Sequence, residues 1–328
     1  MRVLGLALVG MASICISACT ERADPQAPVS AAEQATKVTP REGAPYVLKN
    51  TQVWSVPDPV SGRDYEVFVS LPASYEGDPQ RRYPTLYVTD ADYAFPIIRQ
   101  IARRVNLNGP VIEDFILVGL SYAKGEDGVA SRNRDYTPVP CQPLNRCALP
   151  HGGGGAYQSY LKDEVLPFIE GRFRGDPNAR VILGHSYGGL LGAQILFTDP
   201  RLFRSYILGS PSFWFADRHI MTMEADYART HTDLPAEVFM YIGGFETPGP
   251  TPRHAGRFDM VGDMQTMSQS LTSRDYPSLR LRSIVLTDED HLTVAPVGFT
   301  RALMAVLPAK PWSDGPATDS AQVIEPVR

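Results

Sequence analysis

The sequence predicts an α/β fold in which a mostly parallel sheet is covered by helices on both faces. Two patterns predict it. Short apolar runs alternate with helical patterns along the chain, which is the order expected for parallel strands joined by crossover helices. Residues 83–89 and 114–120 are also nearly continuous apolar runs, as in strands buried on both faces.

The remaining elements follow from their periodicity. Residues 63–72 alternate polar and apolar side chains and predict an edge strand. Residues 121–155 show no clear element, and a loop of that length in a compact domain is usually functional. The other expected helices are residues 156–172, 258–273 and 294–307, and the other expected strands are residues 205–209, 237–243 and 279–286.

A serine flanked by glycines lies between a predicted strand and a predicted helix. The stretch runs from Gly184 to Gly189, directly after the apolar residues 179–183, and Ser186 is at its centre. A nucleophile on a sharp strand-to-helix turn needs neighbours two residues away with almost no side chain. Gly184 and Gly188 meet that need, so the pattern predicts a nucleophilic serine.

A serine nucleophile requires a base and an acid that orients the base. In α/β-hydrolases, which this strand–serine–helix order resembles, acid and base follow the serine in the chain. His291 follows the last predicted strand and is the expected base, because its loop lies at the carboxyl edge of the sheet. Glu246 follows the strand before it and is the expected acid, with Asp263 as its main rival.

Two backbone N–H groups are expected to bind the oxyanion. One belongs to Tyr187, the residue after the nucleophile. The other is expected from the loop after residues 83–89, and we assign it to Asp92, with Ala91 as the alternative. The carboxylate of Asp92 should then point away from the site.

The first nineteen residues read as an export signal. Arg2 precedes an apolar run too short to span a membrane, and residues 16–19 are similar to a bacterial lipobox in which Cys19 is lipidated. Thr20 after the cysteine implies the outer membrane rather than the inner one. Residues 20–45 read as a flexible tether, residues 46–308 as the catalytic domain and residues 309–328 as a disordered tail.

Net charge and cysteine content indicate which partners and ligands to expect. The net charge is −5 with both signs dispersed, which argues against nucleic acid as a partner. Cys141 and Cys147 lie in one loop, and in an oxidising periplasm they are expected to form a disulfide. Zinc is the alternative, but two cysteines without nearby paired histidines make a poor site, so we expect no metal.

Several motifs resemble the esterase D-like group of putative esterases, which includes ferric-siderophore trilactone esterases. The similarity covers roughly residues 50–308, and the stretch from Arg132 to Pro138 is particularly similar to the siderophore-esterase branch. The resemblance implies a serine hydrolase that needs no cofactor, with Ser186 as nucleophile, His291 as base and Glu246 as acid. The motifs that carry it are residues 83–92, 132–138, 184–189, 210–214 and 289–291.

The residues that could contact the substrate each have two interpretations. Arg132 and Arg134 either bind an anionic substrate or hold the long loop through ion pairs. Trp214 either lines the acyl pocket or belongs to the core. The function expected is hydrolysis of a small ester, including siderophore trilactones; the alternatives are acyl transfer on the same scaffold and a catalytically silent ligand-binding lipoprotein.

Overall fold

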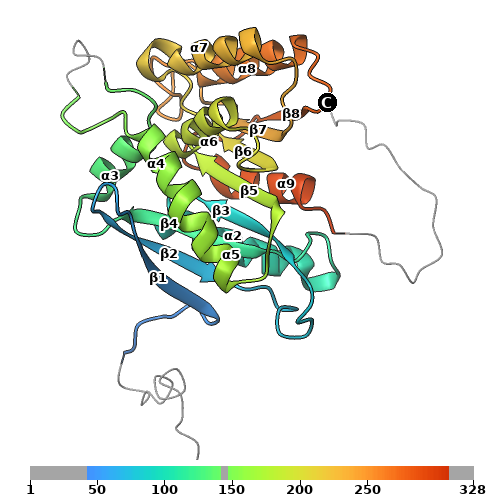
Figure 1. Ribbon diagram of the computed structural model, residues 1–328. Helices are drawn as coiled ribbons and strands as arrows, with labels where there is room; N and C mark the ends of the chain where they lie inside the picture. The colour runs from blue at the N-terminus through green and yellow to red at the C-terminus, as the bar shows by residue number, and fades with distance from the viewer. Residues whose placement is uncertain (1–42, 142–146, 310–328) are drawn as a thin grey trace, which may run out of the picture. The chain divides into compact units, whose positions relative to one another are not determined.

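The computed structural model describes residues 43–141 and 147–309, and from Leu48 onward these form one compact unit (Figure 1). The expected signal, the lipid site Cys19, most of the tether and almost all of the tail lie outside the described residues. No helix within the described residues is long and apolar enough to cross a membrane.

One eight-stranded sheet organises the molecule, with strand order β1-β2-β4-β3-β5-β6-β7-β8. β2 pairs antiparallel with both of its neighbours, β1 and β4. All other neighbouring strands, from β4 to β8 in the sheet order, pair parallel. The strands are β1 (Thr51–Pro57), β2 (Asp64–Ser70), β3 (Tyr83–Val88), β4 (Ile116–Ala123), β5 (Gly175–His185), β6 (Ser205–Gly209), β7 (Glu237–Gly243) and β8 (Arg280–Leu286).

Helices cover both faces of the sheet, as the α/β prediction requires (Figure 1). One face carries α2 (Ala91–Val105) and α9 (Val294–Val306). The other carries α4 (Gly154–Tyr160), a π-helical turn (Leu161–Val165), α5 (Leu166–Arg172), α6 (Tyr187–Thr198), α7 (Phe215–Thr230) and α8 (Met260–Ser273). The described residues also form the short helix α3 (Gly128–Asp135) and the 3-10 turn Asn106–Asn108.

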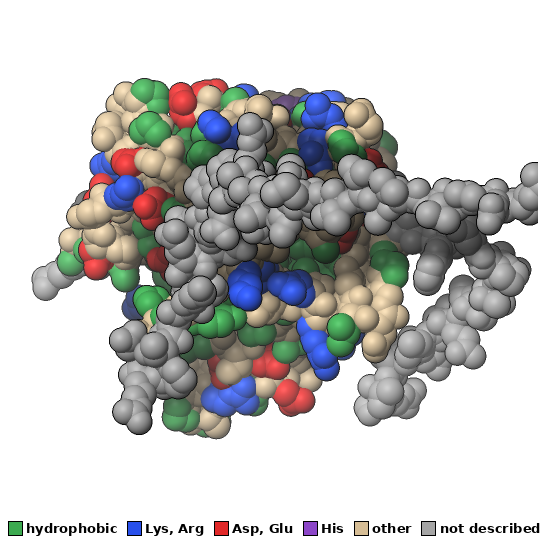
Figure 2. Space-filling model, turned by 90° about the horizontal axis from the view of Figure 1, so that it is seen from below, with side chains coloured by type: hydrophobic (Ala, Val, Ile, Leu, Met, Phe, Trp, Pro, Cys, Tyr) green, Lys and Arg blue, Asp and Glu red, His purple; other side chains and the backbone are tan. Residues whose placement is uncertain are grey.

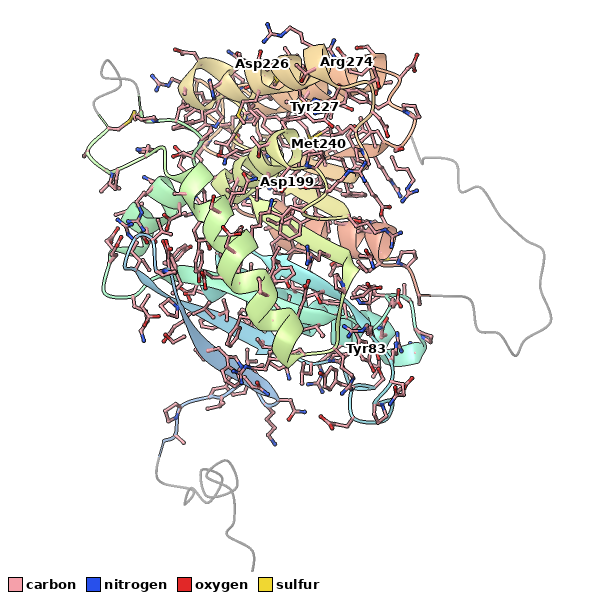
Figure 3. All side chains as sticks on the ribbon, viewed as in Figure 1. Tyr83, Asp199, Asp226, Tyr227, Met240 and Arg274 are labelled. Carbon is pink, nitrogen blue, oxygen red and sulfur yellow. A yellow bond between two sulfur atoms is a disulfide. The ribbon has the colours of Figure 1, made fainter. Side chains whose placement is uncertain are left out.

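The interior consists of two apolar layers, one on each side of the sheet. Side chains fill the space between sheet and helices in Figure 3, where Tyr83 and Met240 are fully buried. Asp226 and Arg274 lie on the outer surface over α7 and α8. On the face seen in Figure 2, basic and acidic side chains are interspersed with apolar ones.

Three expectations about elements were wrong. Residues 63–72 do not form the edge strand: β1 takes that place and pairs with β2 along its whole length. The long segment 121–155 contains α3, whose N-cap Asp127 accepts a hydrogen bond from the Ala130 N–H at 3.0 Å. Residues 215–230, for which no element was expected, form α7, although residues 216–218 at its start have positive φ.

Candidate active site

The predicted nucleophile lies on a strained turn between β5 and α6. Ser186 has φ 61° and ψ −118°, a conformation that L residues rarely adopt. A Cβ on Gly184 would lie 2.1 Å from the carbonyl carbon of Gly188, and one on Gly188 would lie 2.2 Å from Thr89 Oγ1. Only glycine fits these two positions, so the sequence motif and the backbone geometry agree.

Glu246 and His291 meet beside this turn. His291 Nδ1 donates to Glu246 Oε2 at 2.6 Å, and the glutamate is completely buried. The other carboxylate oxygen, Oε1, accepts from Ser210 Oγ at 2.5 Å and from the Gly243 N–H at 2.8 Å. These donors hold Glu246 as an acceptor toward His291, which leaves Nε2 of the imidazole as the basic nitrogen.

The hydroxyl of Ser186 is hydrogen-bonded with Ser212 Oγ at 3.3 Å. Ser212 is buried, and its N–H donates to the carbonyl of Ser186 at 3.1 Å. Among the described residues, Ser186 Oγ makes no hydrogen bond to His291. Such contacts are often long in a free enzyme and form when substrate binds.

Two helix N-termini converge next to Ser186. Tyr187 begins α6 and Ala91 begins α2, so their N–H groups and that of Asp92 have no partner in the helical ladder. The segments touch, because a Cβ on Gly188 would lie 3.4 Å from Asp90 Oδ2. The structure thus places the predicted donor Asp92 in the first turn of a helix rather than in a loop, and its exposed carboxylate accepts from Ser121 Oγ at 3.4 Å.

A buried ion pair fixes the start of α2. Asp90, 1% exposed, has φ 55° and accepts from Arg132 Nε at 2.7 Å and from Tyr122 Oη at 2.7 Å. Burial opposes the charge of Arg132, but Asp90 outweighs it and holds the pKa of the guanidinium above its usual range. Arg132 also donates to the carbonyl of His185 at 3.2 Å, which connects the start of α2 to the turn that carries Ser186.

The two arginines of the loop motif have separate environments. Arg134 donates to Asp135 at 2.8 Å and pairs with Glu126. The pair with Glu126 joins the C-terminal end of α3 to the residues just before its N-terminus. Arg132 lies near the Ser186 turn, with its guanidinium carbon 5.3 Å from the centre of the Tyr187 ring. The loop-holding interpretation therefore describes the contacts that both side chains make.

His185 precedes the nucleophile and contacts the expected base. Its Nε2 donates to the carbonyl of His291 at 2.9 Å, and the two rings are 4.8 Å apart. Burial, then electrostatic interactions with His291 and Arg132, lower the pKa of His185 to about 3. A neutral His185 thereby holds the backbone of the catalytic loop.

A cavity of about 410 Å³ opens beside Tyr187. Trp214 forms one wall, where its ring stacks on Phe258 at 4.0 Å. The disulfide between Cys141 and Cys147, confirmed by the structure, forms the rim. One histidine, His151, lies beside that disulfide, but both sulfur atoms are already joined to each other. Phe215, Ala216, Asp217 and Arg257 complete the lining.

The rival acid has another partner. Asp263, the main rival of Glu246, is 4% exposed and accepts from Arg218 Nε at 2.6 Å. Asp259 caps α8 through the Gly262 N–H at 3.0 Å. Of the candidate acids, Glu246 is the one hydrogen-bonded to the His291 ring.

Sequence reasoning assigned no individual role to the residues that position the site: Ser210, Ser212, His185, Asp90 and Arg253. Ser210 and Ser212 follow β6 at the carboxyl edge of the sheet, which was the available signal. Arg253 donates to Asp290 Oδ2 at 2.7 Å, directly before the base, and lowers the pKa of that carboxyl. A sequence gives no sign of this contact across 37 residues.

The sheet order, the strained serine turn and the buried acid–imidazole pair together define an α/β-hydrolase. The chain belongs to the putative esterase family, whose model matches residues 59–255.

Among its relatives, the ferri-bacillibactin esterase BesA of Bacillus subtilis (strain 168) is 27% identical over 83% of this chain and 93% of its own. The siderophore triacetylfusarinine C esterase of Aspergillus fumigatus is 31% identical over 74% of this chain and 88% of its own. The solved structure of the BES protein from Bacillus cereus has the same fold, with a TM-score of 0.70 at 23% identity, covering 83% of this chain and all of that one.

Proposed function

We propose that this protein is a serine carboxylic-ester hydrolase that works through an acyl-enzyme on Ser186. The observation that carries the proposal is the 2.6 Å hydrogen bond from His291 to the buried Glu246 beside a serine with φ 61°. Membership of the esterase family supports the same reaction class.

The mechanism follows from the contacts. His291 Nε2 takes the proton of Ser186 Oγ as that oxygen attacks the ester carbonyl, and Glu246 stabilises the imidazolium that forms. The N–H groups of Tyr187 and Asp92 bind the oxyanion at two helix N-termini, where the helix dipole favours negative charge. The imidazolium then protonates the leaving alcohol, and water releases the acid by the reverse proton path.

Comparing the wild type with Ser186→Ala on a p-nitrophenyl ester tests this reaction. Wild type should hydrolyse the ester, and Ser186→Ala should retain only background activity. Ser159→Ala, an exposed serine on α4, is the matched control and should match wild type. Equal hydrolysis by wild type and Ser186→Ala would exclude Ser186 as nucleophile, and tight binding of an ester without turnover would favour a silent binding protein.

The substrate that we propose is a siderophore trilactone. Support comes from the relatives, two of which are named as esterases of ferri-bacillibactin and of triacetylfusarinine C. The cavity beside Tyr187, with the stacked Trp214 and Phe258, provides an aromatic wall for a planar acyl group. A small ester panel that includes a trilactone, analysed by mass spectrometry, should show ring opening of the trilactone; hydrolysis of simple esters alone would contradict this substrate.

We further propose that the chain is anchored through a lipid on Cys19 at the periplasmic side of the outer membrane. The support is the lipobox-like sequence at residues 16–19 and the following Thr20. Cys19→Ser should move the protein from the membrane fraction to the soluble fraction and abolish labelling by radioactive palmitate. A labelled, membrane-bound Cys19→Ser variant would contradict the proposal.

A further inference from the structure

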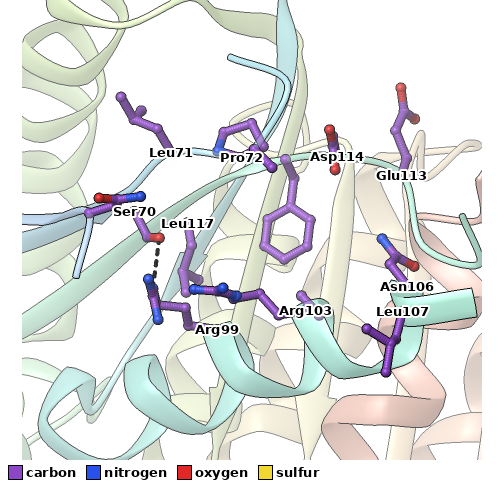
Figure 4. Close-up of a pocket in the computed structure, with 14 residues that line it drawn as sticks. Ser70, Leu71, Pro72, Arg99, Arg103, Asn106, Leu107, Glu113, Asp114 and Leu117 are labelled. Atoms are coloured by element: carbon purple, nitrogen blue, oxygen red, sulfur yellow. Dashed lines mark hydrogen bonds between the residues drawn. The ribbon is translucent and has the colours of Figure 1, made fainter. Parts of the chain in front are cut away.

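A second cavity, of about 400 Å³, lies at the opposite edge of the sheet from Ser186. It is formed by the C-terminal half of α2, the end of β2 and the start of β4 (Figure 4). Arg103 is eleven positions along α2 from Asp92, about 16 Å along the helix axis. This cavity is therefore separate from the esterase site, and its volume is in the range of small-molecule sites.

Two guanidinium groups line this cavity. Arg99 is 7% exposed, and its Nε donates to Ser70 Oγ at 3.2 Å. Arg103 extends from the next turn of α2 toward the strands, on the same side as Arg99 (Figure 4). Within residues 43–141 and 147–309, Arg103 makes no hydrogen bond and no ion pair. Its donors are thus available to a ligand.

The carboxylates at the rim are occupied elsewhere. Glu113 accepts from Arg81 at 3.4 Å, and Asp114 accepts from the Ser74 hydroxyl. Figure 4 shows both carboxyl groups on the far rim, directed away from Arg103. Among the described residues that line the cavity, no carboxylate is paired with Arg103, which leaves a positive charge on the side next to α2.

The remaining walls are apolar. Phe115, directly before β4, and Leu117 belong to the same apolar layer as α2, and Leu71 and Pro72 follow the end of β2. An occupant that matches these walls combines one anionic group with an apolar body. A planar carboxylate fits best, because a guanidinium binds it through two parallel N–H donors.

From this arrangement, we propose that the cavity is a second binding site for a small carboxylate with an apolar or aromatic body. The source can be an ester-hydrolysis product or another organic acid, and the two share the chemistry that the cavity recognises. The proposal does not depend on the esterase reaction, since none of the cavity residues belongs to the Ser186 site.

Calorimetric titration of the full chain with 3-phenylpropanoate tests the proposal. Arg103→Gln should weaken binding by at least about tenfold, the loss expected for a hydrogen bond to a charged group. Arg104→Gln is the matched control. Arg104 is the next residue of α2, is exposed and does not line the cavity, so its replacement removes the same charge outside the proposed site. It should leave the affinity unchanged, and neutral 3-phenylpropanol should bind far more weakly than the acid.

Three results would overturn the proposal: no binding of the acid, binding that Arg103→Gln leaves intact, or equal weakening by Arg103→Gln and Arg104→Gln. Folding is controlled through the melting temperature of Arg103→Gln, which should match wild type because Arg103 has no partner among the described residues. Hydrolysis of a p-nitrophenyl ester that addresses Ser186 alone should also be unchanged in Arg103→Gln.

Discussion

Replacement of His185 by glutamine should reduce the loss in free energy of unfolding that the protein suffers when the pH is lowered. His185 is 7% exposed, and its pKa falls from the ordinary value of 6.5 to about 3 in the folded protein. Glutamine keeps an N–H near the position of Nε2, which can still donate to the carbonyl of His291, but it never takes up a proton.

The sign follows from linkage. The folded pKa is depressed, so the unfolded chain binds the proton first as the pH falls, and stability is lost from about pH 6.5 toward about pH 3. At about pH 5 the pH is about one and a half units below the pKa of His185 in the unfolded chain, so that histidine is protonated there. In the folded protein, with a pKa of about 3, it remains neutral. Since one unit is about 1.4 kcal/mol, the loss at this pH is about 2 kcal/mol.

Urea unfolding of both proteins at about pH 8 and about pH 5 measures this difference. All other titrating groups are common to the two chains, so their contributions cancel. Wild type should lose about 2 kcal/mol more than His185→Gln between the two pH values. Equal losses would show that His185 is protonated in the folded state and would refute its assignment as a neutral clamp.

Three further outcomes are expected. Glu246→Gln should reduce kcat by about 10²–10⁴-fold with little change in KM, since an amide no longer stabilises the imidazolium; a fall of less than threefold would contradict its role. Gly184→Ala should prevent formation of the active turn, because the new Cβ would meet backbone at 2.1 Å; a soluble variant of wild-type activity would contradict the turn geometry. Arg132→Met should lower the free energy of unfolding by about 3–5 kcal/mol, because Asp90 stays buried without its charge partner; urea unfolding measures the change, and a change below about 1 kcal/mol would contradict the importance of the pair.

The sequence was sufficient for the parallel core of the fold. Runs such as residues 83–89 and 237–243 are nearly continuous in apolar side chains, a pattern typical of strands buried on both sides. It failed for β1, where Val53 and Gln52 are exposed at the sheet edge and pairing with β2 decides the structure. It failed also for α7, whose polar surface hides the few buried positions that hold the helix to the core.

Part of the candidate site, too, could be predicted from the sequence, and part of it could not. Ser186, Glu246 and His291 each follow a strand end, and chain topology alone brings such residues to one edge. The supporting contacts do not follow from topology. Ser210 reaches Glu246 and Arg132 reaches Asp90 through the conformations of loops, which depend on tertiary packing.

The central claim is that an ester is cleaved through a covalent bond to Ser186. Rapid acid quench of the enzyme with a p-nitrophenyl ester, followed by peptide mass spectrometry, tests it most directly. We expect one acyl group on the peptide that contains Ser186, and none on that peptide in Ser186→Ala. Turnover of the ester with an acyl group on a different residue, or unchanged turnover in Ser186→Ala, would contradict the account.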